Sequence, residues 1–267
     1  MTGTELAHYH EHGFVVLPGL FSAEERAAWL RQLAALIQHE VEPAGAMVVM
    51  RDVMVVKGLV RPEAREAAVA KVQDFDDDPV LSGYTRHPRL LEQVEPITGQ
   101  HIVSIHNMLI NKPPGVDGRH PLHQDLLYFP FRPADRIVGC WTALEPPHRE
   151  NGCLAVVPGS HRGALLRHEN PEWDYLNVGY FGAVGVGAHP DRVHLALAPG
   201  DTVLFHPLLL HGSGRNRSPG YRRAISSHFA DARCHYPPGV DRSGNRRYRL
   251  VRGEHQPGGL LEASGTP

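Results

Sequence analysis

A histidine and an aspartate two residues apart, with a second histidine far along the chain, are the residues best suited to do chemistry. His123 and Asp125 flank Gln124, and His211 lies 86 residues beyond Asp125. Two imidazoles and one carboxylate form the facial triad that holds a non-haem Fe(II) by one face and leaves the opposite coordination positions open. The pattern therefore predicts an iron site that can also take O₂ and small ligands.

The strands expected around these residues explain the spacing. Residues i and i+2 of a β-strand point to the same side, so a strand over 121–129 would deliver His123 and Asp125 to one metal ion. His211 follows an apolar run over 202–210, which predicts a second strand. Arg222 lies 11 residues further on, where a returning strand would place a guanidinium suited to bidentate carboxylate binding.

Taken singly, each of these residues also has a structural explanation. His-x-Asp tripeptides arise by chance in a chain with 19 histidines, and motif matches carry false positives. The combination of a same-face pair, a distant strand-end histidine and an arginine one hairpin away favours a metal site. The other candidates are expected to have no part in the metal site. Regular alternation would turn His120 and His206 away from the metal, and His161 would support a turn. His228 and His235 would pack or lie at the surface, and Arg223 would point opposite to Arg222 and be solvated.

The composition limits the class of protein. The chain has 267 residues, of which 42% are hydrophobic and 21% charged, as in globular proteins. A net charge of −2 argues against nucleic acid or an anionic membrane surface as the main partner. The sequence contains no run of 18 apolar residues, so no membrane-spanning helix is expected. Three cysteines without paired spacing, and no recognisable secretory or peroxisomal signal, lead us to expect a cytoplasmic protein.

Turn residues and hydrophobic periodicity predict a mainly β fold with flanking α-helices. Helices are expected after the Ser22 capping box to about residue 40, and over 61–71 and 87–97. Strands are expected over 12–20, 101–111, 121–129, 137–144, 153–157, 192–197, 202–210 and 222–230. Such short strands favour a double-stranded β-helix, a cupin-like jelly roll, with N-terminal helices before it.

One domain over residues 1–252 is expected, with its β core at about 101–230. Residues 163–191 interrupt the strand pattern and look like an insertion able to close over a site. The polar, Gly/Pro-rich residues 253–267 are expected to form a disordered tail.

Longer motifs surround the candidate residues. They are NMLINKPP at 107–114, HPLHQDL at 120–126, YFPFRP at 128–133, NGCL at 151–154, GDT at 200–202 and HGSG at 211–214. Together they resemble the phytanoyl-CoA dioxygenase family of Fe(II)/2-oxoglutarate oxygenases, from about residue 5 to about residue 236 and again over 247–254.

The resemblance implies a role for each matching residue. His123, Asp125 and His211 would be the iron ligands, and Arg222 with Ser213 would hold the distal carboxylate of 2-oxoglutarate. Three further residues, Lys71, Met108 and Trp141, would line the cosubstrate pocket. Core packing would equally explain Met108 and Trp141, and a solvated helix end would explain Lys71.

The resemblance also implies a reaction. An Fe(II)- and 2-oxoglutarate-dependent dioxygenase would use O₂ to hydroxylate the 2-position of a fatty, phytanoyl-like acyl-CoA, releasing succinate and CO₂, with ascorbate as a candidate reductant. Asp125 favours hydroxylation, because related halogenases have a small residue in its place. The short stretch at 235–247 leaves open the same chemistry on a free metabolite or natural-product intermediate. The absence of the peroxisomal presequence seen in the family leads us to expect a bacterial, cytoplasmic protein. A non-catalytic cupin-like binding protein is less favoured, and the oligomeric state is open.

Overall fold

The computed structural model describes residues 1–187, 189–240 and 248–261. The α-helices are α1 (Gly3–His12), α2 (Ala23–Gln38), α3 (Val53–Val56), α4 (Ser82–Thr85) and α5 (Pro88–Thr98). The 3₁₀ helices are η1 (Arg65–Ala68), η2 (Asp125–Tyr128), η3 (Ala134–Arg136), η4 (Arg149–Asn151) and η5 (Ser160–Arg162). The strands are β1 (Phe14–Leu17), β2 (Val48–Arg51), β3 (Val69–Gln73), β4 (Ile102–Lys112), β5 (His120–His123), β6 (Ile137–Ala143), β7 (Leu154–Val156), β8 (His168–Glu169), β9 (Gly182–Ala183), β10 (Val193–His194), β11 (Thr202–Phe205), β12 (His211–Ser213), β13 (Arg222–Asp231) and β14 (Arg249–Arg252).

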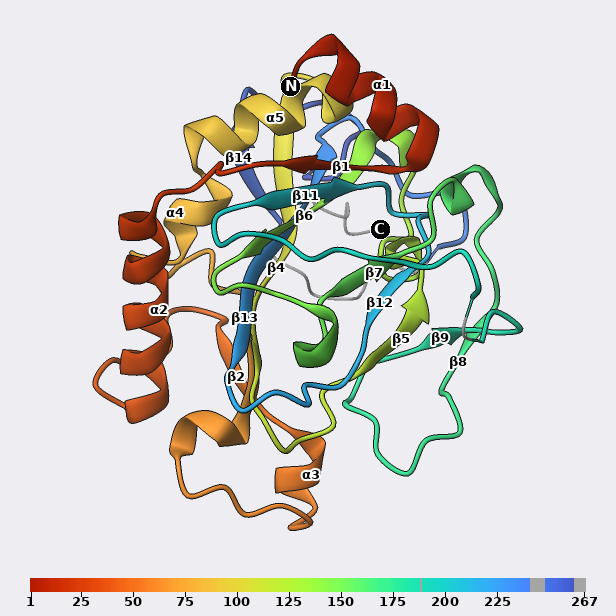
Figure 1. Ribbon diagram of the computed structural model, residues 1–267. Coiled ribbons are helices and arrows are strands. Elements are labelled where there is room, and N and C mark those ends of the chain that lie inside the picture. The colour runs from red at the N-terminus through yellow and green to blue at the C-terminus, as the bar shows by residue number, and fades with distance from the viewer. Residues whose placement is uncertain (188, 241–247, 262–267) are drawn as a thin grey trace.

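Two antiparallel sheets pack face to face, and α2, α4 and α5 lie on the outer side of the larger one (Figure 1). Within the described residues the larger sheet has the order β1-β11-β6-β13-β4-β3-β2, with β14 beside β4. The smaller sheet has the order β10-β7-β12-β5, and β8 and β9 form a separate hairpin. Side chains from both sheets share one apolar cluster, including Trp141 of β6, Val156 of β7 and Phe205 of β11. This is the predicted jelly roll, and the fold class is confirmed.

The helix α2 forms where the sequence predicts it. The Ser22 hydroxyl accepts a hydrogen bond from the Glu25 N–H, and the Glu25 carboxylate accepts one from the Ser22 N–H, which completes the capping box. Trp29, Leu33 and Leu36 follow at helical spacing and are buried against the larger sheet.

The long strands β4 and β13 divide their side chains between two layers. On β13, Ile225 and Phe229 pack in the cluster that includes α2 and α5. Arg222, Ser226 and His228 instead face the space between the sheets. Because the strands pair along their length, with Arg222 opposite Lys112, the inner faces of both strands form one side of that space.

Three expected elements are wrong. Residues 61–71 do not form a helix, because Val69 and Val72 are buried in β3, between β2 and β4, and this pairing overrides the helix-forming Ala and Glu residues. The strand expected over 121–129 ends at His123 and continues as η2. The strand expected over 202–210 ends at Phe205, because residues 206–210 form the turn by which the chain crosses from β11 in the larger sheet to β12 in the smaller.

Residues 253–261 are held against the domain, so the expected disorder is wrong for them. Leu260 is buried, and its N–H donates to the Ala232 carbonyl at 3.0 Å. Residues 262–267 of that tail, and 241–247 of the short 235–247 stretch, lie outside the described residues.

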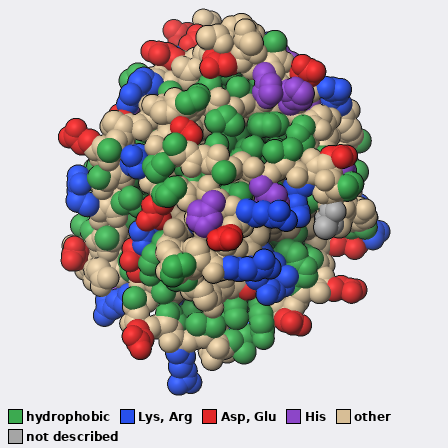
Figure 2. Space-filling view, in the orientation of Figure 1, with side chains coloured by type: hydrophobic (Ala, Val, Ile, Leu, Met, Phe, Trp, Pro, Cys, Tyr) green, Lys and Arg blue, Asp and Glu red, His purple; other side chains and the backbone are tan. Residues whose placement is uncertain are grey.

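Charged side chains of both signs are dispersed over the face shown in Figure 2, in keeping with the small net charge. None of the helices in the described ranges combines the length and apolar character needed to cross a membrane.

Candidate metal centre

A cavity of about 420 Å³ lies between the two sheets, a size suited to small ligands. Its lining includes every predicted site residue, namely Lys71, Met108, His123, Asp125, Trp141, His211, Ser213 and Arg222. The structure therefore brings together residues that are spread over 152 positions of the sequence, from 71 to 222 inclusive.

The two histidine ligands come from neighbouring strands of the smaller sheet. His123 ends β5 and His211 begins β12, and the two residues are direct partners in the register. Asp125 lies beyond the strand, in the first position of η2. Gln124 is nevertheless extended, with φ −119° and ψ 125°, so the alternation of side chains continues and Asp125 returns to the side of His123.

The three side chains can bind one metal ion. One ligand atom from each of His123, Asp125 and His211 lies within 4.8 Å of the others, and all three residues are buried. Nδ1 of His123 donates to the Pro121 carbonyl at 2.8 Å, and Nδ1 of His211 donates to the Leu209 carbonyl at 2.9 Å. With the proton on Nδ1, Nε2 of each ring keeps its lone pair for a metal. Nε2 of His123 lies 3.1 Å from Asp125 Oδ1, and Nε2 of His211 lies 3.5 Å from Asp125 Oδ2. Two fixed imidazoles and one carboxylate fit Fe(II).

Charge also favours cation binding. Burial lowers the pKa of His211 to about 4, so that imidazole is neutral near pH 7. Burial alone would raise the pKa of Asp125, but the neighbouring His211 and His228, with the hydrogen bond from His228, hold that pKa well below its usual range. Asp125 thus presents a negative charge and His211 a neutral nitrogen, the protonation states that metal ligands of these types require.

His228 is buried and packs against Phe129, as one of its two expected roles required, but it also supports the carboxylate ligand, which was not expected. Its Nε2 donates to Asp125 Oδ2 at 2.6 Å, which leaves Oδ1 free to face a metal. The period of two along β13 could have revealed it, because His228 lies six residues after Arg222 and therefore on the same face.

His120 was also misplaced by the sequence reasoning. Its ring stacks on His123 at 3.8 Å and on Tyr180 at 3.9 Å between centroids. The register shifts between His211, opposite His123, and Ser213, opposite His120, so three steps on β5 match two on β12. This bulge returns His120 to the side of His123, although regular alternation would separate them.

Replacing His228 with alanine is expected to weaken Fe(II) binding roughly 10- to 100-fold, because carboxylate ligands depend on such outer partners for orientation. Anaerobic calorimetric titration with Fe(II) measures the effect. The matched control is His206→Ala, which removes a buried histidine that bonds to Asp135 outside the cavity. Equal iron affinity in both variants would contradict the role of His228.

Arg222 is a buried cation without a partner for much of its guanidinium. Its exposed fraction is 2%, and Nε and Nη1 have no hydrogen-bond partner in the described residues. Burial lowers its pKa to about 10, so the group stays charged at neutral pH. A buried unpaired charge is costly, and an anion bound here would offset that cost. Arg222 reaches the cavity from the larger sheet, not from a hairpin with β12 as expected.

The remaining candidates lie on the sides of the cavity. Lys71 is on β3, with Nζ 3.9 Å from Met108 Sδ and 5.3 Å from the centroid of the Tyr180 ring, so it is not at a helix end. The Trp141 ring lies 5.6 Å from the Arg222 guanidinium.

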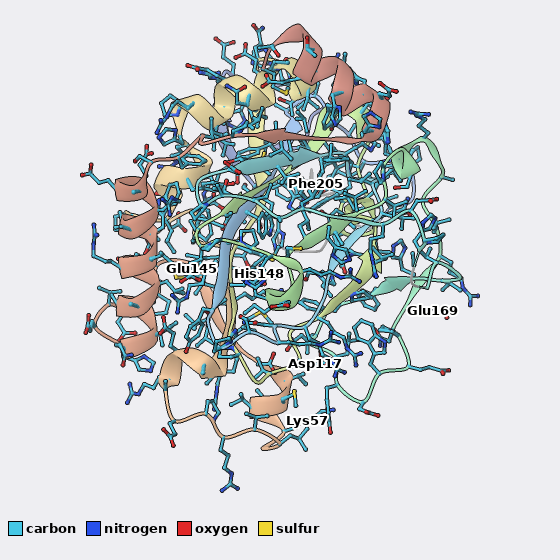
Figure 3. The ribbon with its side chains drawn as sticks, viewed as in Figure 1. Lys57, Asp117, Glu145, His148, Glu169 and Phe205 are labelled. Carbon is cyan, nitrogen blue, oxygen red and sulfur yellow. The ribbon has the colours of Figure 1, made fainter. Side chains whose placement is uncertain are left out.

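Arg223 points to the other side of β13. It forms ion pairs with Glu66 and Glu145, at 2.7 and 3.0 Å, with 13% of its side chain exposed. The expectation of a solvated Arg223 was wrong. Glu145, labelled in Figure 3, lies near α2 on the outer side of the larger sheet.

Known proteins resemble this chain in sequence. The family model described as phytanoyl-CoA dioxygenase (PhyH) matches residues 9–224. The chain is 48% identical to "Phytanoyl-CoA dioxygenase, peroxisomal" of Bos taurus over 85% of this chain and 68% of that protein. It is 42% identical to "Probable phytanoyl-CoA dioxygenase" of Caenorhabditis elegans, over 85% of this chain and 75% of that protein.

Solved structures show the same fold at lower identity. EctD from S. alaskensis with bound Fe has a TM-score of 0.68 at 21% identity, covering 96% of this chain and 88% of EctD. The epimerase SnoN, in complex with Fe3+, alpha ketoglutarate and nogalamycin RO, has a TM-score of 0.67 at 23% identity, covering 95% and 94% of the two chains. The chain also has the His-Asp-His triad. Together with it, the matches show that this chain belongs to the phytanoyl-CoA dioxygenase family and is an iron- and 2-oxoglutarate-dependent dioxygenase.

Proposed function

We propose that this dioxygenase hydroxylates the 2-position of a fatty acyl-CoA of the phytanoyl type, with release of succinate and CO₂. The observation that carries the proposal is the buried guanidinium of Arg222, unpaired at Nε and Nη1, in the same cavity as the triad. It supplies a site for the far carboxylate of a 2-oxo diacid. The substrate class follows the names of relatives that are 42% and 48% identical to this chain.

His123, Asp125 and His211 would hold the iron, which when bound activates O₂ as the 2-oxo acid is decarboxylated. The residues around the iron site would bind and orient the cosubstrate. Arg222 and Ser213 would hold the distal carboxylate of 2-oxoglutarate, so that its 2-oxo end points to the triad. Positioning of this kind turns an encounter between reactants into a step within one complex.

The other cavity residues would bind and shield the substrate. Val178, Gly179, Tyr180 and Phe181 belong to the 163–191 segment and contribute to the lining. Tyr180 stacks on His120, and Tyr128 donates to the Gly179 carbonyl at 2.7 Å, so this segment is tied to the centre. We propose that it covers the bound substrate and excludes water, as closing loops do in other enzymes. Apolar lining residues such as Met50 and Phe129 suit an aliphatic chain.

The substrate is tested by incubating the protein with Fe(II), 2-oxoglutarate, ascorbate and O₂, together with phytanoyl-CoA, straight-chain acyl-CoA or free phytanic acid. We expect mass spectrometry to find one added oxygen atom at the 2-position of an acyl-CoA, with stoichiometric succinate. Uncoupled 2-oxoglutarate turnover without any acyl-CoA product would contradict the substrate. Hydroxylation of the free acid alone would favour a free metabolite.

The cellular compartment of the protein can be tested separately. The sequence led us to expect a cytoplasmic protein, whereas the Bos taurus relative is named as peroxisomal. Fractionation of the source cells, followed by detection of the full chain, distinguishes the two compartments.

A further inference from the structure

A second buried cation lies beside Arg222. Lys112 ends β4 and is the direct cross-strand partner of Arg222 on β13, so both side chains project from the same face of the sheet into the cavity. Each residue is 2% exposed. Like charges directly opposite each other destabilise a sheet, and burial away from water increases the cost. This cost suggests that the second cation, Lys112, has a function in the cavity.

Within the described part of the chain, no carboxylate lies at ion-pair distance from Lys112 or Arg222. Asp117, labelled in Figure 3, pairs with Arg119 at 3.0 Å and with Arg215 at 2.8 Å. Burial, and then the charge of Arg222, lower the pKa of Lys112 well below its usual range. A carboxylate bound between the two cations would remove this repulsion and favour the protonated form of Lys112.

Lys112 is held in one position by neutral groups. Its Nζ donates to Ser213 Oγ and to the Gly214 carbonyl, both at 2.7 Å. Its stem packs against Gly118, where a Cβ would lie 3.4 Å from Lys112 Cγ. The backbone carbonyl of Lys112 accepts from Asn216 Nδ2 at 2.9 Å. The ammonium thus reaches from the larger sheet to the turn that follows the iron-ligand strand β12.

The contact with Ser213 sets the direction of the hydroxyl proton. A protonated lysine has donors and no acceptor, so Ser213 Oγ must accept from it. The hydroxyl has a single O–H, which remains available for an acceptor inside the cavity. A carboxylate held by Arg222 is such an acceptor.

We propose that Lys112 is a positioning residue for the distal carboxylate of 2-oxoglutarate, which it serves by orienting the Ser213 hydroxyl and adding a second positive charge beside Arg222. This inference rests on the proposed function, in which Arg222 and Ser213 bind that carboxylate. Lys112 itself touches neither the metal ligands nor the reacting end of the cosubstrate.

The test compares Lys112→Met with the wild type by anaerobic calorimetry on the Fe(II)-loaded protein and by thermal melting of the metal-free protein. The probes are 2-oxoglutarate and 2-oxobutyrate, which lacks the distal carboxylate. We expect the Kd for 2-oxoglutarate to rise roughly 10- to 100-fold, as for loss of a hydrogen bond to a charged group, and the Kd for 2-oxobutyrate to stay unchanged. The melting temperature should rise or stay the same, because an uncompensated buried charge is removed.

Lys57→Met, at an exposed position after α3, is the matched control and should change none of these values. Unchanged binding of 2-oxoglutarate by Lys112→Met would overturn the inference alone. So would equal weakening for both oxo acids with a lower melting temperature, which would assign Lys112 a purely structural role. A wild-type protein that binds neither oxo acid would overturn the proposed function, and the inference with it.

Discussion

Replacing Asp125 with asparagine is expected to weaken Fe(II) binding by more than about 100-fold, because loss of a direct ligand should exceed the 10- to 100-fold effect of outer partners. The amide keeps the volume of the carboxylate but removes the negative charge that the metal binds. It also replaces the acceptor of the His228 hydrogen bond, now 2.6 Å long, with a neutral group. Turnover of 2-oxoglutarate should fall to the background of the metal-free protein.

Anaerobic titration with Fe(II) and measurement of succinate release check this result. Asp135→Asn is the matched control, since Asp135 also bonds to a histidine, His206, but its side chain is 91% exposed and lies outside the cavity. Asp135→Asn should bind iron like the wild type. Retention of near-normal iron affinity by Asp125→Asn would contradict the assignment of the triad.

The second large effect is expected from Arg222→Met. Removing one partner of a buried charge pair costs about 2–5 kcal/mol, which corresponds to a rise in the Kd for 2-oxoglutarate of roughly 30-fold to several thousand-fold. Arg222→Lys should be intermediate, because lysine keeps the charge but lacks the planar fork of donors. The cosubstrate-free protein should not lose stability, since Nε and Nη1 of Arg222 have no partner there.

Calorimetric titration with 2-oxoglutarate and thermal melting without it separate these effects. The neighbouring Arg223→Met is the control, because Arg223 forms its ion pairs on the other side of β13. It should lower the melting temperature by leaving Glu66 and Glu145 unpaired, and leave the Kd unchanged. An unchanged Kd with a lower melting temperature in Arg222→Met, or a raised Kd in Arg223→Met, would contradict the role of Arg222.

Residue types and their spacing were enough to predict the candidate ligand set. The interval between His123 and Asp125, the distant His211 and the later Arg222 predicted a metal centre with an anion site, and the structure gathers all four residues at one cavity. The capping box at Ser22 predicted the start of α2. These features are local or depend only on residue chemistry, so they can be predicted without knowing which distant residues come into contact.

Which side chains meet depends on the packing of the two sheets. Strand periodicity assigns His228 to the inner face of β13, but contact with Asp125 requires the two sheets to pack together. The approach of Lys112 to Ser213 likewise joins residues of different sheets, 101 positions apart. The bulge that turns His120 onto His123 comes from the pairing of β5 with β12. Partners, register and packing are properties of non-local contacts, so local residue patterns predicted the ligands, and the fold selected the residues that orient them.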